Sequence, residues 1–385
     1  MLWDAKWENR SCLWILMLWV LFSHSGPTLR AGTSSHPESI SCDRRATLAI
    51  QALQSWYDED TGLYRTTGWW NAANAITVLA DYSRITGSRK YESVFLNTLS
   101  AAQKTYPGFI NQFYDDEGWW ALAWIDVYGV TLDQRYLVVA KSIFTDMTGA
   151  WDRTCSGGIW WSKDRKYKNA IANELFLAVA AQLATRTADQ LERAGYLVWA
   201  EKEWHWFSQS GMINASHLVN DGLNDSCANN RQTTWSYNQG VIAGALVELY
   251  KADRDPTLLS EAGMIAEAAL SSMTDARGIL HDPCEPDCGA DGTQFKGIFV
   301  RNLRTLDEIE ARPRYERFAF TNADSIWAQV HSPDYHLGEV WAKPFGVSNA
   351  STQSSALDAL VTAAEMWRTA SKSEARPALP AIFPK

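Results

Sequence analysis

The sequence predicts an all-α protein built from six helical hairpins. Apolar residues recur at helical spacing along most of the chain, as in Leu48, Ala52, Leu53 and Trp56, and strand-like alternation is scarce. In addition, a similar glycine- and tryptophan-containing phrase recurs before every second helix. Such regular recurrence is typical of an architecture that repeats one helix–loop–helix unit.

The repeated phrase opens helices that are rich in alanine. Residues 68–76 read Gly-Trp-Trp-Asn-Ala-Ala-Asn-Ala-Ile, and residues 118–125 read Gly-Trp-Trp-Ala-Leu-Ala-Trp-Ile. The helices that follow are apolar on several faces, which indicates buried inner helices, whereas the helices between them are more one-sided, which indicates an outer ring. Looser versions of the phrase occur at 157–161 followed by 169–175, at 234–240, at 297–300 and at 351–356.

Six such hairpins can stack as an open solenoid or close into a double ring. The loops that carry glycine, tryptophan and acidic residues all precede inner helices, so a closed ring would collect them in one funnel. We therefore expect a closed ring. Because no low-complexity linker divides the chain, the sequence predicts a single domain over residues 31–385.

Residues 1–30 are expected to be a signal peptide. Lys6 and Arg10 precede the apolar run 12–22, which is too short to span a bilayer as a helix but fits a signal-peptide core. Acidic residues also precede this run, which leaves an uncleaved anchor as the alternative. The segment 375–385 is proline-broken and too short for a GPI signal. We expect a secreted, monomeric protein, extracellular or in a cell wall, without a membrane anchor after cleavage.

The remaining cysteines agree with secretion. The short spacing of Cys284 and Cys288 suits a local disulfide, and Cys155 with Cys227 is the natural second pair. This pairing leaves Cys42 without a predicted partner. Three glycosylation sequons, which also fit secretion, begin at Asn214, Asn224 and Asn349.

Charge and composition exclude some classes of partner. The net charge of −9 argues against a nucleic-acid partner, because phosphate binding needs a basic face. Neither a paired CxxC motif nor an HExxH motif occurs, so no metal and no cofactor is predicted. The 20 tryptophans are many for 385 residues. Flat indoles pack well on the C–H faces of sugar rings, although a wide helical core would also bury most of them.

The stretch 114–120, Tyr-Asp-Asp-Glu-Gly-Trp-Trp, places three acids beside two indoles just before an inner helix, with Gly118 at the turn. One interpretation is an acidic helix start, which the helix dipole favours. The other is a catalytic pair, because a loop can splay Asp115 and Asp116 to the roughly 5–5.5 Å that a retaining glycosidase needs. Repulsion and burial would then keep one carboxyl protonated. The residues alone leave both interpretations open, and Glu117 is expected to be an ordinary first-turn residue.

Further candidates for substrate contact stand near the starts of inner helices. Of the tandem tryptophans at 69–70, 119–120 and 160–161, one indole of each pair is expected in the core and one in the funnel. Amides suit sugar hydroxyls, but asparagine is also an ordinary helix N-cap. The candidates are Trp70, Asn71, Trp119, Trp120, Asn173, Tyr237 and Asn238.

Together these motifs resemble glycoside hydrolase family 76, in the right order and over nearly the whole mature chain. The resemblance implies an (α/α)6 barrel and endo-acting hydrolysis of α-1,6-mannan with retention, in which Asp115 is the nucleophile and Asp116 the acid/base. The motifs that carry it lie at 68–75, 114–124, 157–161, 169–174, 234–240 and 297–302.

The resemblance is closest to fungal members, which share the CxxxC loop found here at 284–288. Some of those relatives are GPI-anchored wall proteins thought to transfer mannan-bearing glycans onto wall glucan. A wall transglycosidase that uses the same two aspartates is therefore the alternative function. A glycan-binding protein without activity is a third, and the intact acid pair counts against it.

Overall fold

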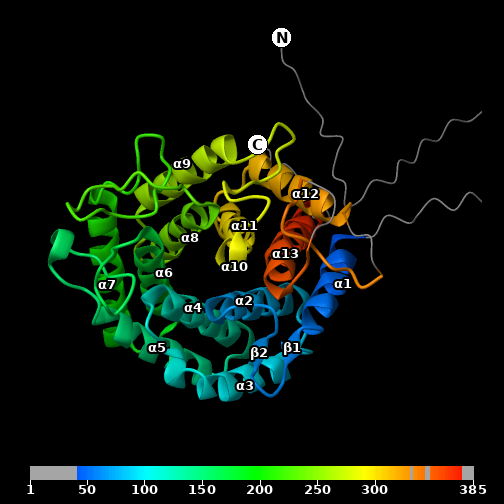
Figure 1. The fold of residues 1–385 in the computed structure, drawn as a ribbon, viewed down its shortest axis with the longest axis horizontal. Helices are drawn as coiled ribbons and strands as arrows, with labels where there is room; N and C mark the ends of the chain where they lie inside the picture. Colours follow the sequence, from blue (N-terminus) through cyan, green and yellow to red (C-terminus); the bar gives the residue numbers. More distant parts are fainter. Residues whose placement is uncertain (1–40, 330–332, 343–346, 375–385) are drawn as a thin grey trace, which may run out of the picture.

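The computed structural model describes residues 41–329, 333–342 and 347–374. The predicted signal peptide lies outside these residues. Within them the chain forms two concentric layers of helices (Figure 1). The inner layer consists of α2 (Trp69–Thr86), α4 (Tyr114–Thr131), α6 (Ala170–Arg186), α8 (Ser236–Asp253), α11 (Phe295–Asp307) and α13 (Ala350–Glu374). The outer layer consists of α1 (Cys42–Gln54), α3 (Glu92–Ala101), α5 (Gln134–Thr148), α7 (Gln190–Gln209), α9 (Pro256–Ser272) and α12 (Pro313–Trp327).

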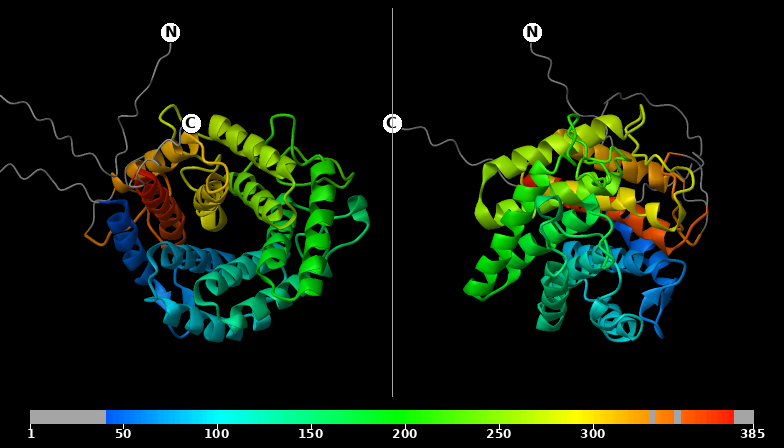
Figure 2. Two further views of the ribbon diagram at one scale, coloured as in Figure 1. Left: turned by 180° about the vertical axis from the view of Figure 1, so that it is seen from behind. Right: turned by 60° about the vertical axis from the view of Figure 1, so that its left-hand side comes forward.

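The inner helices close into a ring. Contacts run from α2 to α4, α6, α8, α11 and α13 in turn, and α13 packs back on α2. Figure 2 shows the ring from behind and in a view turned by 60°. Gln353 of α13 also reaches the N-terminal hairpin, because its Nε2 donates to the carbonyl of Ala49 in α1 at 2.9 Å. The expected closed ring of helical hairpins is therefore confirmed, and the open solenoid is excluded.

Glycines allow inner helices to approach closely. A Cβ on Gly118 would lie 2.7 Å from the Cβ of Leu175 on α6, and one on Gly240 would lie 2.5 Å from the Cα of Phe299 on α11. Side chains cannot occupy such gaps, so glycine is required for the contact. Gly118 was expected to mark a turn before the helix. That expectation is wrong, since Gly118 lies inside α4.

Three of the outer helices begin at aspartate caps. Asp133, Asp189 and Asp255 precede α5, α7 and α9, and each side chain accepts hydrogen bonds from backbone N–H groups of the first turn. Such a cap satisfies donors that have no partner inside the helix. In the described residues no helix is long and apolar enough to cross a membrane.

Short elements fill the loops between the helices. The strands β1 (Tyr57–Asp58) and β2 (Leu63–Tyr64) form an antiparallel hairpin. A four-residue helix, α10 (Gly289–Gly292), precedes α11. The 3-10 turns are Ala102–Lys104, Pro107–Phe109 and Thr154–Ser156.

Both predicted disulfides are present. Cys155 pairs with Cys227, which ties the loop before α6 to the loop before α8, and Cys284 pairs with Cys288 within one loop. Cys42 is also disulfide-bonded, so the expectation that it lacks a partner is wrong. An odd number of cysteines in the mature chain had suggested otherwise.

The three glycosylation sequons differ in accessibility. Asn224 is exposed on a loop. Asn214 is half-buried, and its Nδ2 donates to Oδ1 of Asn220 at 3.0 Å. Asn349 caps α13, because its Oδ1 accepts from the N–H of Thr352 at 2.9 Å. Modification at these asparagines stays a prediction.

Candidate active site

Four aromatic side chains form a floor at one end of the ring. Trp70 stacks on Trp119 (centroids 5.6 Å apart), Trp119 on Tyr237 (6.5 Å), Tyr237 on Phe295 (3.8 Å), and Phe295 on Trp70 (6.4 Å). They come from the first two turns of α2, α4, α8 and α11. The N-terminal ends of these inner helices therefore meet around one aromatic surface, which we call the aromatic floor.

Phe295 was not predicted, although it occupies the first position of its inner helix. An aromatic residue at the start of an inner helix is the same signal that marked Trp70 on α2. Phe295 was missed because the repeated phrase near it, at 297–300, lacks tryptophan and begins two residues after it.

The acidic pair lies in the first turn of α4, beside this floor. Asp115, Asp116 and Glu117 are helical, so the pair is not in the preceding loop as expected. Trp161 Nε1 donates to Oδ2 of Asp115 at 2.8 Å, and the N–H of Asp116 donates to Oδ1 of Asp115 at 3.1 Å. Asn111 Nδ2 donates to Oδ2 of Asp116 at 2.6 Å. The two interpretations of this stretch are thus compatible, since an acidic helix start also holds two oriented carboxyls.

Both carboxyls of the pair are harder to ionise than an ordinary aspartate. Burial raises the pKa of Asp115 and the charge of Asp116 raises it further, against the hydrogen bond from Trp161. Burial also raises the pKa of Asp116; the hydrogen bond from Asn111 opposes this, and the charge of Asp291 adds to it. Two carboxyls this close titrate as a pair. At a pH where exposed carboxyls have all ionised, the pair therefore still holds a proton.

The third acid of the motif serves the fold. Glu117 is fully buried and forms an ion pair with Lys163 (3.1 Å), which also pairs with Asp146 on α5 (2.9 Å). Burial, followed by the charge of Asp146, raises the pKa of Glu117 to about 8. Glu117 therefore points to the outer layer rather than to the floor, as expected for a first-turn residue outside the catalytic pair.

A buried lysine fixes the loop that delivers Trp161. Lys168 is 2% exposed. A charge so deeply buried is stable only when it is hydrogen-bonded. Trp161 is in turn joined to the helix start, because the N–H of Tyr114 donates to the Trp161 carbonyl at 2.9 Å. The acceptors of Lys168 Nζ are Oδ1 of Asp152 and the carbonyls of Thr154, Gly157 and Gly158.

The structure places several predicted substrate contacts away from the floor. Asn173 is fully buried and bonds to the backbone N–H and carbonyl of Ile159, so it anchors the Trp161 loop. Asn71 exchanges hydrogen bonds with Gln294, and Asn238 is fully buried in α8.

Trp120 belongs to the core rather than to the funnel. It is 0% exposed and packs against Trp69, Phe109 and Trp124. Its neighbour Trp119 is part of the floor, as the division of each tandem pair into one core and one funnel indole had suggested. Of the predicted contacts, the floor therefore contains Trp70, Trp119 and Tyr237.

Two further acids at this end were missed by sequence reasoning. Burial raises the pKa of Tyr237 well above its usual value, and the charges of Asp221, Asp115, Glu174 and Asp291 add to the effect in that order. Asp221 and Asp291 therefore lie close enough to Tyr237 to act on it. Among 44 acidic residues, a single aspartate outside any repeated phrase has no sequence signal.

A separate polar cavity of about 220 Å³ lies beneath Trp119. Residues of α2, α4, α6, α8 and α11 line it, and some of its charges pair with one another, as in Arg304 with Asp81 (2.9 Å) and Arg186 with Glu248 (3.0 Å). Several of the charges that line the cavity are therefore held in ion pairs between inner helices. Asp115 and Asp116 do not line this cavity; they lie in the first turn of α4, beside the floor.

Residues 41–375 match the family model described as glycosyl hydrolase family 76. The mannan endo-1,6-alpha-mannosidase DFG5 of Candida albicans is 26% identical over 325 residues, covering 76% of this chain and 71% of that protein. The mannan endo-1,6-alpha-mannosidase DCW1 of the same species is 27% identical over 267 residues, covering 61% of this chain and 57% of that protein. The chain thus spans little more than half the length of this second relative.

Solved structures have the same fold. A protein from Listeria innocua superposes with a TM-score of 0.77 at 26% identity, covering 85% of this chain and 98% of that chain. A variant of the alpha-1,6-mannanase GH76A of Salegentibacter sp. HEL1_6 superposes with a TM-score of 0.76 at 25% identity, covering 84% and 99%. That variant is described as inactive, carries asparagine in place of two consecutive aspartates, and is in complex with alpha-1,6-mannotriose.

Proposed function

The chain belongs to glycosyl hydrolase family 76, and from this premise we propose that it cleaves α-1,6-mannosidic linkages within mannan with retention of configuration. The observation that carries the proposal is the Asp115–Asp116 pair, held by Trp161 and Asn111 beside the aromatic floor. The inactive Salegentibacter mannanase supports it, because the two aspartates changed there are also consecutive.

Asp115 is the proposed nucleophile. It receives two N–H donors, from the Trp161 indole and the Asp116 backbone, and such hydrogen bonds favour an ionised, oriented carboxylate. Although the pKa of Asp115 is raised more than that of Asp116, the pair shares its proton, so hydrogen bonding decides the roles. The carboxylate attacks the anomeric carbon and forms a covalent glycosyl-enzyme.

Asp116 is the proposed acid/base. Asn111 occupies its Oδ2, which leaves Oδ1 to carry the proton. Asp116 donates this proton to the departing glycosidic oxygen and then takes one from the water that releases the mannosyl group. The aromatic floor offers flat faces to the C–H faces of the sugar rings.

The disulfides support a location of the protein outside the cytosol, because such bonds persist in oxidising compartments. We propose that the enzyme is secreted and acts on extracellular or wall mannan.

Product analysis on unbranched α-1,6-mannan tests the function. NMR should show internal cleavage, with the α-anomer as the first product. Asp115→Asn and Asp116→Asn should each lose nearly all activity while remaining folded. Release of the β-anomer, or full activity in either variant, would refute the mechanism. A labelled glucan acceptor added to the reaction would become conjugated only if transfer competes with water, which would instead favour a transglycosidase.

A further inference from the structure

An additional carboxylate, not used in the mechanism above, stands at the aromatic floor. Asp291 lies in α10, and its Oδ1 accepts a hydrogen bond from Trp70 Nε1 at 3.0 Å. Trp70 stacks on Trp119, which follows Asp116 by three residues on α4 and therefore lies almost one helical turn further along the same side. Asp291 thus contacts the floor directly and lies near the carboxyl proposed to donate the proton.

The helix that carries Asp291 is packed on a disulfide. A Cβ on Gly292 would lie 2.6 Å from the Cβ of Cys288 and 3.2 Å from Sγ of Cys284, so the backbone of α10 rests against the Cys284–Cys288 bridge. We call residues 282–292, from the loop before the bridge to the end of α10, the disulfide arm. The position of Asp291 depends on how this arm is held.

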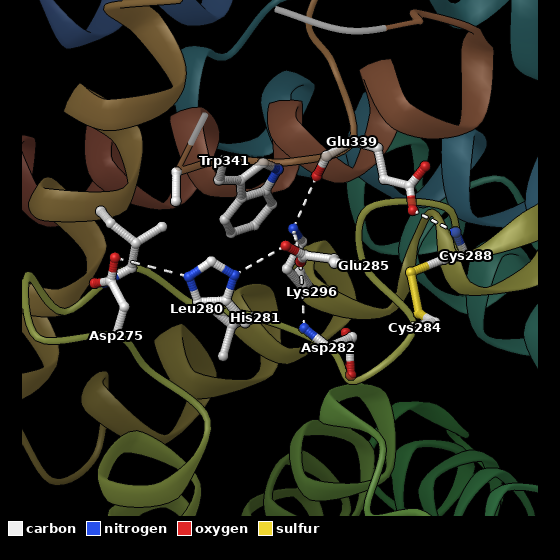
Figure 3. Close-up of polar contacts among 12 residues, drawn as sticks. Asp275, Leu280, His281, Asp282, Cys284, Glu285, Cys288, Lys296, Glu339 and Trp341 are labelled. Atoms are coloured by element: carbon white, nitrogen blue, oxygen red, sulfur yellow. Dashed lines mark hydrogen bonds and ion pairs between the residues drawn. A yellow bond between two sulfur atoms is a disulfide. The ribbon is translucent and has the colours of Figure 1, made fainter. Parts of the chain in front are cut away.

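A buried lysine holds the disulfide arm in place (Figure 3). Lys296, 2% exposed at the start of α11, forms an ion pair with Glu285 and donates to the backbone carbonyl of Glu339 at 2.8 Å. Oε1 of Glu339 in turn accepts from the N–H of Cys288 at 2.8 Å. The arm is therefore fixed to the segment before α13 as well as to α11.

The other end of the arm is fixed to α8. Asp282 is buried, and its Oδ1 accepts from the N–H of Ser236 at 2.8 Å while its Oδ2 accepts from the Ser236 hydroxyl at 2.5 Å. His281, just before the arm, contacts Glu285 through Nδ1 at 2.9 Å. With both ends held, Asp291 occupies a fixed position relative to the barrel.

The charged groups that act on Asp116 are few. On its own helix the neighbour is Asp115, with which it titrates as a pair, and from α10 it is Asp291. The connection before α4 contributes Asn111, which is neutral. Asp291 is thus the carboxylate outside the pair whose charge disfavours ionisation of Asp116.

We propose that Asp291 is a positioning residue for the general acid: from the disulfide arm its charge keeps the proton on Asp116, and its hydrogen bond orients Trp70 in the floor. This inference rests on the proposed function. The ordinary alternative is that Asp291 only orients the indole.

Asp291→Asn separates these roles, because asparagine keeps an acceptor oxygen for Trp70 and removes the charge. The alkaline limb of the kcat/KM profile on α-1,6-mannan should move to lower pH by about half a unit or more, since a like charge near the acid has gone. At pH values above the alkaline limb, kcat/KM of Asp291→Asn should be about threefold or more below that of the wild type. The matched control Asp287→Asn, an exposed position on the same arm, should leave the profile in place.

A substrate that needs no acid gives a second readout. Dinitrophenol leaves without protonation, so Asp291→Asn should hydrolyse a dinitrophenyl α-1,6-mannobioside at the wild-type rate. An equal loss on both substrates, or an unmoved alkaline limb, would overturn the proposal and leave only the orienting role.

The inference can also be tested without turnover. In protein labelled with carboxyl-13C aspartate, the Asp116 signal, assigned by its absence in Asp116→Asn, should titrate at lower pH in Asp291→Asn than in wild type. An unchanged titration refutes the role of Asp291. Failure of the wild-type enzyme to cleave mannan refutes the proposed function instead, so the two failures are distinguishable.

Discussion

Trp161 donates its indole N–H to Oδ2 of Asp115 at 2.8 Å, across a separation of 46 residues in the sequence. The indole reaches the helix start because the loop before α6 folds back onto the segment before α4, where Phe113 and Ser162 form a β-bridge. A residue of one hairpin thus orients the proposed nucleophile of the preceding one.

Trp161→Phe should reduce kcat with little change in stability, because the side chain is exposed and phenylalanine keeps the ring. Loss of a hydrogen bond to a charged group costs about 1.5–3 kcal/mol, which corresponds to roughly a ten- to hundredfold slower reaction. Steady-state kinetics on mannan measure this reduction in kcat. Trp204→Phe, on the outer helix α7, is the control and should retain wild-type kcat. A Trp161→Phe enzyme with wild-type kcat would show that the indole does not assist Asp115.

Lys168→Met should destabilise the protein. The lysine is buried, and methionine would remove the donor to the carbonyls of Gly157 and Gly158 and one of the donors to Asp152. Leaving a buried acceptor without a hydrogen-bond donor typically costs about 1–3 kcal/mol, and urea unfolding measures this loss of stability. Lys166→Met, two residues earlier with 81% of its side chain exposed, should change the free energy of unfolding little. Equal stabilities of the two variants would contradict the anchoring role of Lys168.

Glu174→Gln should change how stability depends on pH. Glu174 is fully buried, and burial followed by the charge of Asp221 raises its pKa well above the usual value. The folded protein therefore keeps a proton that the unfolded chain loses above about pH 4.3, so stability falls by about 1.4 kcal/mol per pH unit above that point, until the folded group ionises. Glutamine cannot ionise, so the free energy of unfolding of the variant should lack this part of its dependence on pH.

Denaturant unfolding at pH 5 and pH 8 measures the effect, with the exposed Glu201→Gln as the control. The difference between the two pH values should be smaller in Glu174→Gln than in wild type and unchanged in the control. Identical slopes in all three proteins would mean that Glu174 is not held protonated.

Gly118→Ala and Gly129→Ala should have opposite effects, although both lie on α4. An added Cβ at Gly118 meets the Cβ of Leu175 at 2.7 Å, and overpacking of this kind typically costs about 1–3 kcal/mol. At Gly129 a Cβ meets nothing within 4 Å, and alanine should gain up to about 1 kcal/mol from helix propensity. Thermal unfolding should therefore show a lower Tm for Gly118→Ala and a higher Tm for Gly129→Ala than for the wild type. A stable Gly118→Ala protein would show that α4 and α6 can move apart.

The fold could be predicted because its main signal is local. Alanine-rich apolar helices and one-sided helices alternate along the chain, and this alternation alone indicates an inner and an outer layer. The acidic pair could be predicted because Asp115 and Asp116 are adjacent and flanked by tryptophan. Both features are visible within a window of a few residues.

The remainder of the site depends on contacts that no local window contains. Asn173 could bind a sugar or a loop with the same amide, and only the position of Ile159 decides between them. Phe295 completes the floor by stacking on Tyr237, far away in the sequence. Asp291 acquires its neighbours only when the disulfide arm folds over the ring.

The packing of α13 on α2 has a consequence for biosynthesis. Gln353 and Ala49, which are hydrogen-bonded in the folded protein, are 304 residues apart in the sequence. Almost the entire chain must be synthesised before this contact can form. Until then, the first five hairpins expose the apolar surface that the last hairpin will cover. Such exposed surface promotes aggregation during synthesis. We therefore expect the nascent chain to depend on chaperones until its last helix arrives, and the barrel to close in one late, cooperative step.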